Sequence, residues 1–218
     1  MRDSDWPHVF LPADPTSAGS PLLLLHGTGG DEHSLLPLRD HLCPGAAVLS
    51  VRGSVLENGM PRFFRRVREG VFDEDDLRHQ ANELAAFVAN ASAAYGIEER
   101  SLIAVGFSNG ANIASALLLE RPGVLAGAVL LSAMLPFAAP PDADLTGTVV
   151  VISNGDRDPM IPAEMTRELA RQFRDRRAEV VELAHPGGHQ IDPAVLAQIA
   201  NVIARPERPH VGQRKESQ

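Results

Sequence analysis

The stretch AVGFSNGAN, residues 104–112, decides how the chain is interpreted, because its character changes twice along its length. It begins as an apolar run typical of a buried strand and ends in residues that favour a helix. Between them lies Ser108, with glycine at positions 106 and 110. A tight strand–turn–helix connection needs these glycines, because a β-carbon at either site would crowd the neighbouring backbone. We therefore expect the Ser108 hydroxyl to project above the edge of a sheet.

Short apolar runs alternate with helix-like segments along the whole chain, which is the pattern of an α/β domain. Most of the runs are uniformly apolar, as in a mostly parallel sheet covered by helices on both faces. The last run alternates and is expected near an edge, and HVFLP at 8–12 is expected to add an antiparallel edge strand. The six predicted strands of the parallel part are 21–26, 46–51, 102–107, 126–132, 148–153 and 178–184.

The clearest helical pattern covers residues 73–95. Its first turn is acidic, which suits the positive end of a helix dipole, and Gly96 is placed to end it. One face of this helix carries Leu77, Ala81, Leu84, Ala85 and Val88. Shorter helices are predicted at 109–120, 162–175 and 192–203. The connection 52–72 is predicted to be the longest irregular segment, and the remaining length leaves no room for a large cap domain.

The chain of 218 residues suits one domain, which we expect to span 1–204 and to be followed by a flexible polar tail at 205–218. A net charge of −8 argues against nucleic acid as a partner. Neither a secretory signal nor a membrane span is predicted, because no apolar stretch is long enough. The single cysteine, Cys43, excludes an intramolecular disulfide. We expect a cytoplasmic protein, with homodimer formation left open.

The Ser108 hydroxyl needs a base to become a nucleophile, and the base needs an acid to orient it. Loops after later strands offer two candidates for each partner. For the base, His189 follows two glycines on a loop that can reach back over Ser108, so we prefer it to His185. For the acid, Asp158 lies further into its loop than Asp156 and precedes a proline that restrains its backbone, so we prefer Asp158. The chain order is then Ser, Asp, His.

The oxyanion of an acyl-transfer reaction needs backbone N–H donors, one of which comes from the residue after the nucleophile, here Asn109. We expect the second from HGTGGDEH at 26–33, with Thr28 preferred and Gly29 next. No cofactor is expected, because this loop lacks the endings of phosphate-binding loops. A metal site is not expected either: His26 is predicted to brace the loop, and the polar residues at 31–33 are predicted to begin a helix.

With these motifs in place, the sequence resembles the phospholipase/carboxylesterase branch of the α/β-hydrolase superfamily, which includes small cap-less bacterial carboxylesterases and acyl-protein thioesterases. The resemblance spans about residues 21–192. It implies an α/β-hydrolase fold with Ser108, Asp158 and His189 as the catalytic triad and Thr28 and Asn109 at the oxyanion hole. The stretches that carry it are LLLHGTGGDE, GFSNGA, LSAMLPF, NGDRDPMIP and PGGHQ.

The chain departs from the thioesterases of this branch at Asn109, where the eukaryotic-type enzymes usually carry glutamine. GFSNGAN and ENGMPRFFRR are more similar to the bacterial esterase subgroup, whose members are sometimes described as dienelactone-hydrolase-like. True dienelactone hydrolases use a cysteine nucleophile, so Ser108 argues against that chemistry.

The substrate side is expected to involve the connection 52–72, because long connections at the carboxyl edge of a sheet are often functional. Packing within the domain is the alternative for each of its apolar residues. Basic residues at 62, 65, 66 and 68 would suit a carboxylate-bearing substrate, although pairing with nearby acids is the preferred interpretation. The residues predicted to line the pocket are Met60, Phe63, Phe64, Met134, Leu135, Met160 and Ile161.

The sequence therefore predicts a serine carboxylesterase that acts on small or short-chain esters, a small-molecule substrate class. A thioesterase, a lysophospholipase or an acyltransferase with the same triad is the alternative, because acceptor choice depends on pocket shape. A non-catalytic binding protein of the same fold is a third interpretation, disfavoured because every triad candidate is present.

Overall fold

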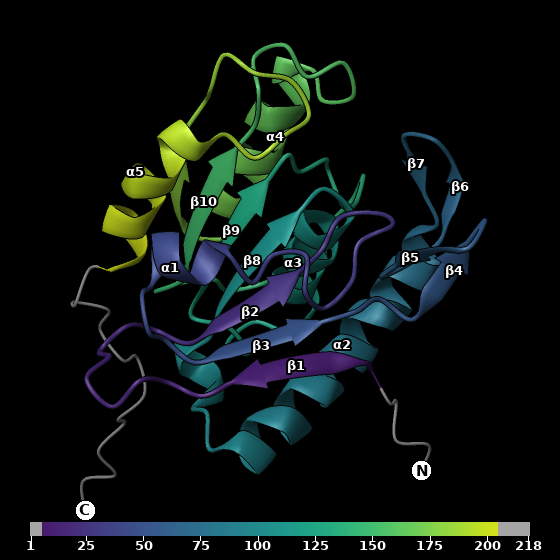
Figure 1. Cartoon of the computed structure of the whole chain (residues 1–218). Coiled ribbons are helices and arrows are strands. Elements are labelled where there is room, and N and C mark those ends of the chain that lie inside the picture. Colours follow the sequence, from purple (N-terminus) through teal and green to yellow (C-terminus); the bar gives the residue numbers. More distant parts are fainter. Residues whose placement is uncertain (1–5, 205–218) are drawn as a thin grey trace, which may run out of the picture.

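The computed structural model describes residues 6–204, so the tail predicted at 205–218 lies outside the described residues. Its centre is a seven-stranded sheet with the order β1-β3-β2-β8-β9-β10-β11 (Figure 1). The strands are β1 (His8–Leu11), β2 (Leu22–Leu25), β3 (Val48–Val51), β8 (Ile103–Phe107), β9 (Gly127–Leu131), β10 (Val149–Ser153) and β11 (Glu179–Glu182).

All neighbouring strands of this sheet are parallel except β1, which pairs antiparallel with β3. The predicted antiparallel edge strand is thus confirmed, and β11 forms the opposite edge, as the alternation in its sequence indicated. In β2, Leu22 and Leu24 pack into one core and Leu23 and Leu25 into the other. Burial on both faces explains why the central strands are uniformly apolar.

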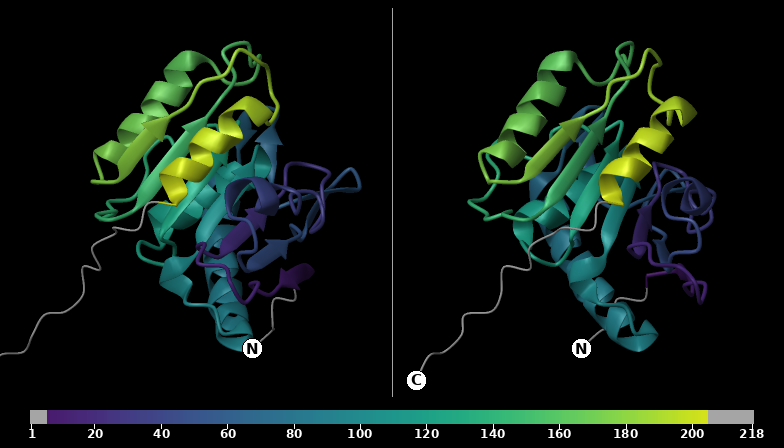
Figure 2. Two further views of the ribbon diagram at one scale, coloured as in Figure 1. Left: turned by 60° about the vertical axis from the view of Figure 1, so that its left-hand side comes forward. Right: turned by 90° about the vertical axis from the view of Figure 1, so that its left-hand side faces the viewer.

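Helices cover both faces of the sheet, as predicted. In the right-hand view of Figure 2, α4 and α5 lie on opposite sides of the sheet. Residues of α2, α3 and α4 belong to the larger core cluster, whereas residues of α1 and α5 belong to the smaller one. The helices are α1 (Leu38–Leu42), α2 (Glu74–Tyr95), α3 (Asn109–Glu120), α4 (Ala163–Arg174) and α5 (Pro193–Ile203), and a 3-10 turn, η1, covers Glu99–Ser101.

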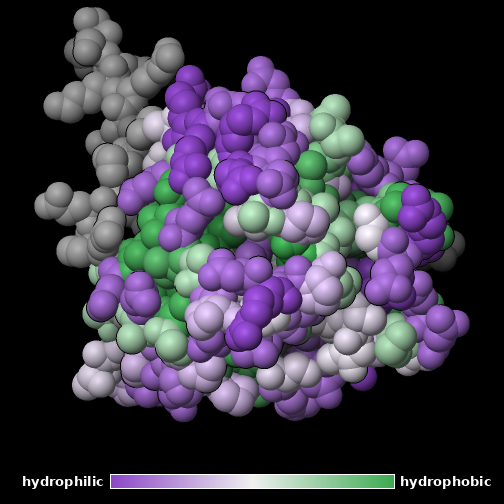
Figure 3. Space-filling model, turned by 90° about the horizontal axis from the view of Figure 1, so that it is seen from above, coloured by the Kyte–Doolittle hydropathy of each residue, from purple (hydrophilic) through white to green (hydrophobic). Residues whose placement is uncertain are grey.

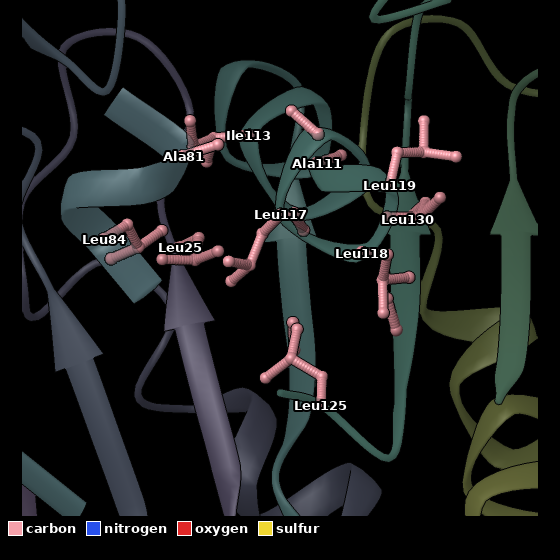
Figure 4. Close-up of a cluster of buried hydrophobic side chains, with 14 of the residues drawn as sticks. Leu25, Ala81, Leu84, Ala111, Ile113, Leu117, Leu118, Leu119, Leu125 and Leu130 are labelled. Atoms are coloured by element: carbon pink, nitrogen blue, oxygen red, sulfur yellow. The ribbon is translucent and has the colours of Figure 1, made fainter. Parts of the chain in front are cut away.

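Helix α2 begins and ends at the residues that its sequence signals predicted. Asp73 caps it by accepting a hydrogen bond of 3.1 Å from the Asp76 amide, and Gly96 ends it with φ 69°. Its predicted apolar face is buried. Leu84 of this helix shares a cluster with Leu25 of β2 and Leu117 of α3 (Figure 4). Helix α3 therefore packs against both the sheet and α2.

The segment predicted to begin a helix at residue 31 forms turns instead, and α1 starts only at Leu38. The Asp31 carboxylate accepts hydrogen bonds from the His33 amide and the Ser34 hydroxyl, at 3.0 and 2.9 Å. Such local bonds stabilise a turn in competition with the helix. The helix prediction was wrong at this end for that reason.

The connection 52–72 is not irregular throughout, which corrects the prediction. It contains two antiparallel hairpins, β4 (Val55–Glu57) with β5 (Met60–Arg62), and β6 (Arg66–Arg68) with β7 (Val71–Phe72). The β4–β5 turn is Asn58-Gly59, with φ 52° and 80°. Asn-Gly is a strong hairpin signal because both residues tolerate positive φ. The hairpins extend from the sheet on the side of β3, at the right of Figure 1.

Candidate active site

Ser108 lies in the sharp turn between β8 and α3, at the edge where the parallel strands end. Its φ of 50° and ψ of −111° are unusual for a residue with a side chain. The turn is held by the Ser108 amide, which donates to the Leu131 carbonyl of β9 at 2.8 Å. A β-carbon on Gly106 would overlap the Gly110 backbone, and one on Gly110 would overlap the Leu25 carbonyl. The two glycines are therefore required by close approach of the backbone, as predicted.

Three side chains from separate loops meet above this turn. His189 Nε2 lies 2.8 Å from Ser108 Oγ, and His189 Nδ1 lies 2.7 Å from Asp158 Oδ2. His189 comes from the loop between β11 and α5, and Asp158 from the loop between β10 and α4. The three residues named from the sequence thus form one continuous hydrogen-bonded chain.

Asp158 is fixed within its loop by a second contact, which uses one carboxylate oxygen and leaves the other, Oδ2, for the histidine. Its Oδ1 accepts a hydrogen bond of 2.8 Å from the Met160 amide, and its side chain is fully buried. The rejected candidate, Asp156, is exposed, and its amide donates to the carbonyl of His185. His185 is buried, and its Nδ1 accepts from the Gly187 amide at 3.2 Å. Asp156 and His185 therefore serve the loop backbone rather than Ser108.

The chain of three side chains can perform acyl transfer at Ser108. With a proton on Nδ1 shared with Asp158, Nε2 is free to accept the Ser108 proton as the hydroxyl attacks a carbonyl. The buried carboxylate then stabilises the imidazolium that forms. Phe107, which sequence reasoning did not single out, packs against His189 with ring centroids 5.5 Å apart. Its position next to Ser108 in the motif was the available signal.

The backbone amides of Thr28 and Asn109, the two predicted oxyanion-hole donors, have no backbone carbonyl as acceptor among the described residues. Asn109 is the first residue of α3, so its N–H has no acceptor within the helix. Among the described residues, no backbone carbonyl accepts from the Thr28 amide, whereas the next amide, of Gly29, donates to Pro61 O at 2.9 Å. This bond favours Thr28 over Gly29 as the second donor.

His26 braces the loop that carries Thr28, as predicted. Its Nε2 accepts a hydrogen bond of 3.0 Å from the Gly53 amide, so the proton resides on Nδ1, which donates to Gly27 O at 2.6 Å. Burial lowers the pKa of His26 below 6.5, and the hydrogen bond to Gly27 only partly opposes this. The ring is therefore neutral at neutral pH, the state its two hydrogen bonds require.

Strand β5 and the residue after it contact both predicted donor residues. Arg62 Nη1 donates to Thr28 Oγ1 at 2.6 Å, and the Phe63 amide donates to Asn109 Oδ1 at 2.7 Å. Arg62 is almost fully buried and also pairs with Glu57 at 3.3 Å. Burial lowers the pKa of its guanidinium, and Glu57 partly opposes this, but an arginine keeps its charge at neutral pH. These contacts were not foreseen from the sequence.

Of the predicted pocket residues in the hairpin region, only Met60 is exposed. A β-carbon on Gly29 would lie 3.7 Å from Met60 Sδ, so the methionine sits beside the Thr28 loop. Phe63 and Phe64 are fully buried in the larger core cluster, where Phe63 stacks on Trp6 at 6.0 Å between centroids. These two rings present no accessible surface to a ligand, because they anchor the hairpins to the domain.

The other four predicted pocket residues belong to two loops. Met134 is buried, with its amide bonded to Asn112, and Leu135 is half-buried against the larger core. Met160 is half-buried beside Asp158, but Ile161 is buried and faces a separate pocket of about 210 Å³. That pocket lies between the start of α4 and the ends of β10 and β11, and neither Ser108 nor His189 lines it. The seven predicted residues therefore do not share one cavity.

Most of the basic cluster is paired with acids. Arg62 and Arg66 share Glu57, at 3.3 and 2.9 Å, and Arg65 pairs with Asp73 and Asp76.

Figure 3 views the molecule from above, onto the edge where the strands end, and shows hydrophobic surface interspersed with polar side chains. Among residues 6–204 there is no group of three His, Cys, Asp or Glu side chains that could hold a metal ion.

A serine at a strand–helix turn, joined to a histidine and an aspartate from later loops of a mostly parallel sheet, defines the α/β-hydrolase class. Comparison with known proteins places the chain more narrowly. It belongs to the phospholipase/carboxylesterase family, whose model matches residues 7–205. Within the part of the chain that the structure describes, no helix is long and apolar enough to cross a membrane.

Relatives and solved structures agree with this assignment. A Bacillus subtilis (strain 168) protein named as a hydrolase, MhqD, is 48% identical over 170 residues, which is 78% of this chain and 85% of that protein. The Bacillus cereus carboxylesterase structure is 40% identical, with a TM-score of 0.88 over 92% of this chain and 94% of its own. A Mesorhizobium loti carboxylesterase structure is 30% identical, with a TM-score of 0.85 over 92% and 95%.

Proposed function

We propose that the protein is a serine carboxylesterase that cleaves small or short-chain esters through an acyl-enzyme on Ser108. The observation that supports this most directly is the continuous hydrogen-bonded chain from Ser108 Oγ through His189 to Asp158. Membership of a family of hydrolases and the similarity to two carboxylesterase structures point to the same reaction class.

The reaction has two halves that use the same groups. His189 takes the Ser108 proton while Oγ attacks the ester carbonyl, and the imidazolium then protonates the leaving alkoxide, which departs as an alcohol. A water molecule, deprotonated by His189, next attacks the carbonyl of the acyl-enzyme. The bond between the acyl carbon and Oγ breaks, the imidazolium returns the proton to Ser108 Oγ, and the carboxylic acid leaves. Asp158 keeps the ring in the required tautomer in both halves.

Negative charge develops on the carbonyl oxygen in each half. In our proposal the amides of Thr28 and Asn109 donate to that oxygen, and the positive end of α3 points at it as well. Met60, Leu135 and Met160, the predicted residues that are not buried, remain the proposed contacts of the acyl or alcohol group. The sheet, its helices and two short hairpins account for the described chain, so no large cap encloses the site. An uncapped site favours small esters.

Activity-based labelling followed by an acyl-chain series tests this proposal. Purified protein should react with a fluorophosphonate probe and hydrolyse p-nitrophenyl esters, fastest for short acyl chains. Ser108→Ala should abolish labelling and lower kcat by about 10⁴-fold or more, because the nucleophile is gone. Wild-type protein that neither labels nor turns over any ester of the series would contradict the proposed function.

A further inference from the structure

The amides of an oxyanion hole have a constraint that other active-site groups lack. They must point at the place where charge develops, yet they cannot use their own hydrogen bonds to stay there, because those bonds belong to the substrate. In this protein each of the two residues that supply the amides is held through its side chain. Arg62 donates a hydrogen bond to the Thr28 side chain, and the Phe63 amide donates one to the Asn109 side chain. Gly29, the residue after Thr28, donates its amide to the Pro61 carbonyl.

We propose that the segment 61–63 clamps the oxyanion hole and that Arg62 is its positioning residue. This inference rests on the proposed function, because it assigns a role within the same reaction. The segment reaches Thr28, Gly29 and Asn109, which come from two distant parts of the chain, through three consecutive residues.

The contact between Arg62 and Thr28 is built as a buried, charge-assisted hydrogen bond. It is 2.6 Å long, and Arg62 is only 4% exposed. The guanidinium is itself oriented by the Phe64 carbonyl at 3.2 Å and by Glu57 at 3.3 Å. A donor fixed at several points restrains its acceptor more than a mobile surface side chain would. Thr28 is therefore held in one orientation.

The charge of Arg62 adds an electrostatic contribution. Glu57 is shared between Arg62, which is buried, and Arg66, which is half-buried, so this group of three side chains has an excess of positive charge. A positive charge held near Thr28, away from water, stabilises an oxyanion more effectively than a solvated one does. Arg62 acts through Thr28 and the local potential, without touching the substrate.

The contact between Phe63 and Asn109 has a similar role on the other side. Asn109 is buried, and among the described residues its Nδ2 has no hydrogen-bond partner, so the bond from Phe63 alone orients the amide group. The segment 61–63 is itself tightly held, because a β-carbon on Gly53 would overlap the Arg62 carbonyl. Gly53 in turn donates to His26, so the start of the Thr28 loop is linked to the same connection as Thr28 and Gly29.

A double-mutant cycle tests the clamp. Thr28→Val keeps the backbone amide and the shape but removes the acceptor, and Arg62→Met removes the donor and the charge. Each should lower kcat by about tenfold, less than the 10²–10³ expected for loss of a whole oxyanion donor, with KM little changed. The double variant should lose little more than Arg62→Met alone, because both changes break one bond.

Several variants and one inhibitor separate positioning from general damage. Thr28→Ser restores the acceptor and should recover activity relative to Thr28→Val. Arg68→Met, an exposed member of the same basic cluster, should leave kcat unchanged. Affinity for a trifluoromethyl ketone, which forms an oxyanion at Ser108, should fall in parallel with kcat/KM. All rates are referred to the concentration of sites titrated with a fluorophosphonate.

Hydrogen exchange tests the clamp without any turnover. The Gly29 amide should exchange faster in Arg62→Met and Thr28→Val than in wild type, and Arg68→Met should match wild type. Additive losses in the cycle, or unchanged exchange together with unchanged kcat per titrated site, would overturn the clamp. If the Gly29 amide exchanges faster in the two variants but the wild-type protein hydrolyses no ester, the result would support the clamp and contradict the proposed function.

Discussion

On one side of Ser108, His189 and Asp158 hold each other through the same hydrogen bonds that the proposed chemistry uses. On the other side, at the proposed oxyanion hole, no backbone carbonyl among the described residues accepts from the amides of Thr28 and Asn109, and their side chains bond instead to Arg62 and to the Phe63 amide. A proton-transfer chain can therefore orient itself, whereas an oxyanion hole needs support from outside. The difference explains why the support lies in a segment that carries none of the predicted triad.

The largest effect is expected on the self-orienting side. Asp158→Asn should lower kcat by about 10⁴-fold, because an amide at that position favours the wrong tautomer of His189. Asp156→Asn, on the same loop but exposed, is the matched control and should retain wild-type kcat. Kinetics with titrated sites and circular dichroism would measure both. Equal losses in the two variants would mean that the loop, and not the Asp158 carboxylate, is what matters.

An intermediate effect should distinguish two buried asparagines, one on each side. Asn109→Ala leaves the Phe63 amide without its acceptor, and Asn154→Ala does the same to Ala133, which Asn154 Oδ1 contacts at 2.9 Å. Each should lower the free energy of unfolding by about 1–3 kcal/mol. Only Asn109→Ala should also lower kcat, by about tenfold, since only it supports the oxyanion hole.

Urea unfolding and initial rates on the same preparations would test this pair. A fall in kcat for Asn154→Ala as large as that for Asn109→Ala would remove the contrast between the two sides.

The smallest effect concerns the pH dependence of stability at His26. Burial holds its folded pKa below 6.5, so the unfolded chain takes up a proton that the folded protein resists. The contribution of neutral His26 to the free energy of unfolding is fully present above pH 6.5, and it is lost as the pH falls from there through the folded pKa. Urea unfolding between pH 8 and 5 should show a steeper decline for wild type than for His26→Gln, which does not titrate. Parallel curves would contradict this assignment.

The sequence predicted the sheet, the main helices and the three residues that meet above the turn between β8 and α3, because each depends on local signals. Apolar runs mark strands buried on both faces, and Ser108, Asp158 and His189 follow such runs at the carboxyl edge. Loop position and flanking residues also favoured, in each pair of neighbouring candidates, the one that joins the hydrogen-bonded chain to Ser108 in the structure.

The hairpin region was less predictable because its contacts depend on how the chain folds back. Asn58-Gly59 could have indicated the β4–β5 turn, but no local pattern places Arg62 against Thr28, which lies 34 positions earlier. Phenylalanines such as Phe63 and Phe64 are equally typical of a pocket wall and of a hydrophobic core. Their burial follows from packing against Trp6 and Phe72, which the sequence alone does not place.

The contact of Gly110 with the Leu25 carbonyl has a consequence for how such a site can be diversified. Helix α3 approaches β2 without an intervening side chain, so a larger residue at Gly110 would force the two elements apart. Variation has to fall on the surrounding loops. A combinatorial library that randomises exposed positions of 54–60 and leaves 104–112 unchanged should therefore keep the proposed nucleophile in place while exploring new ester preferences.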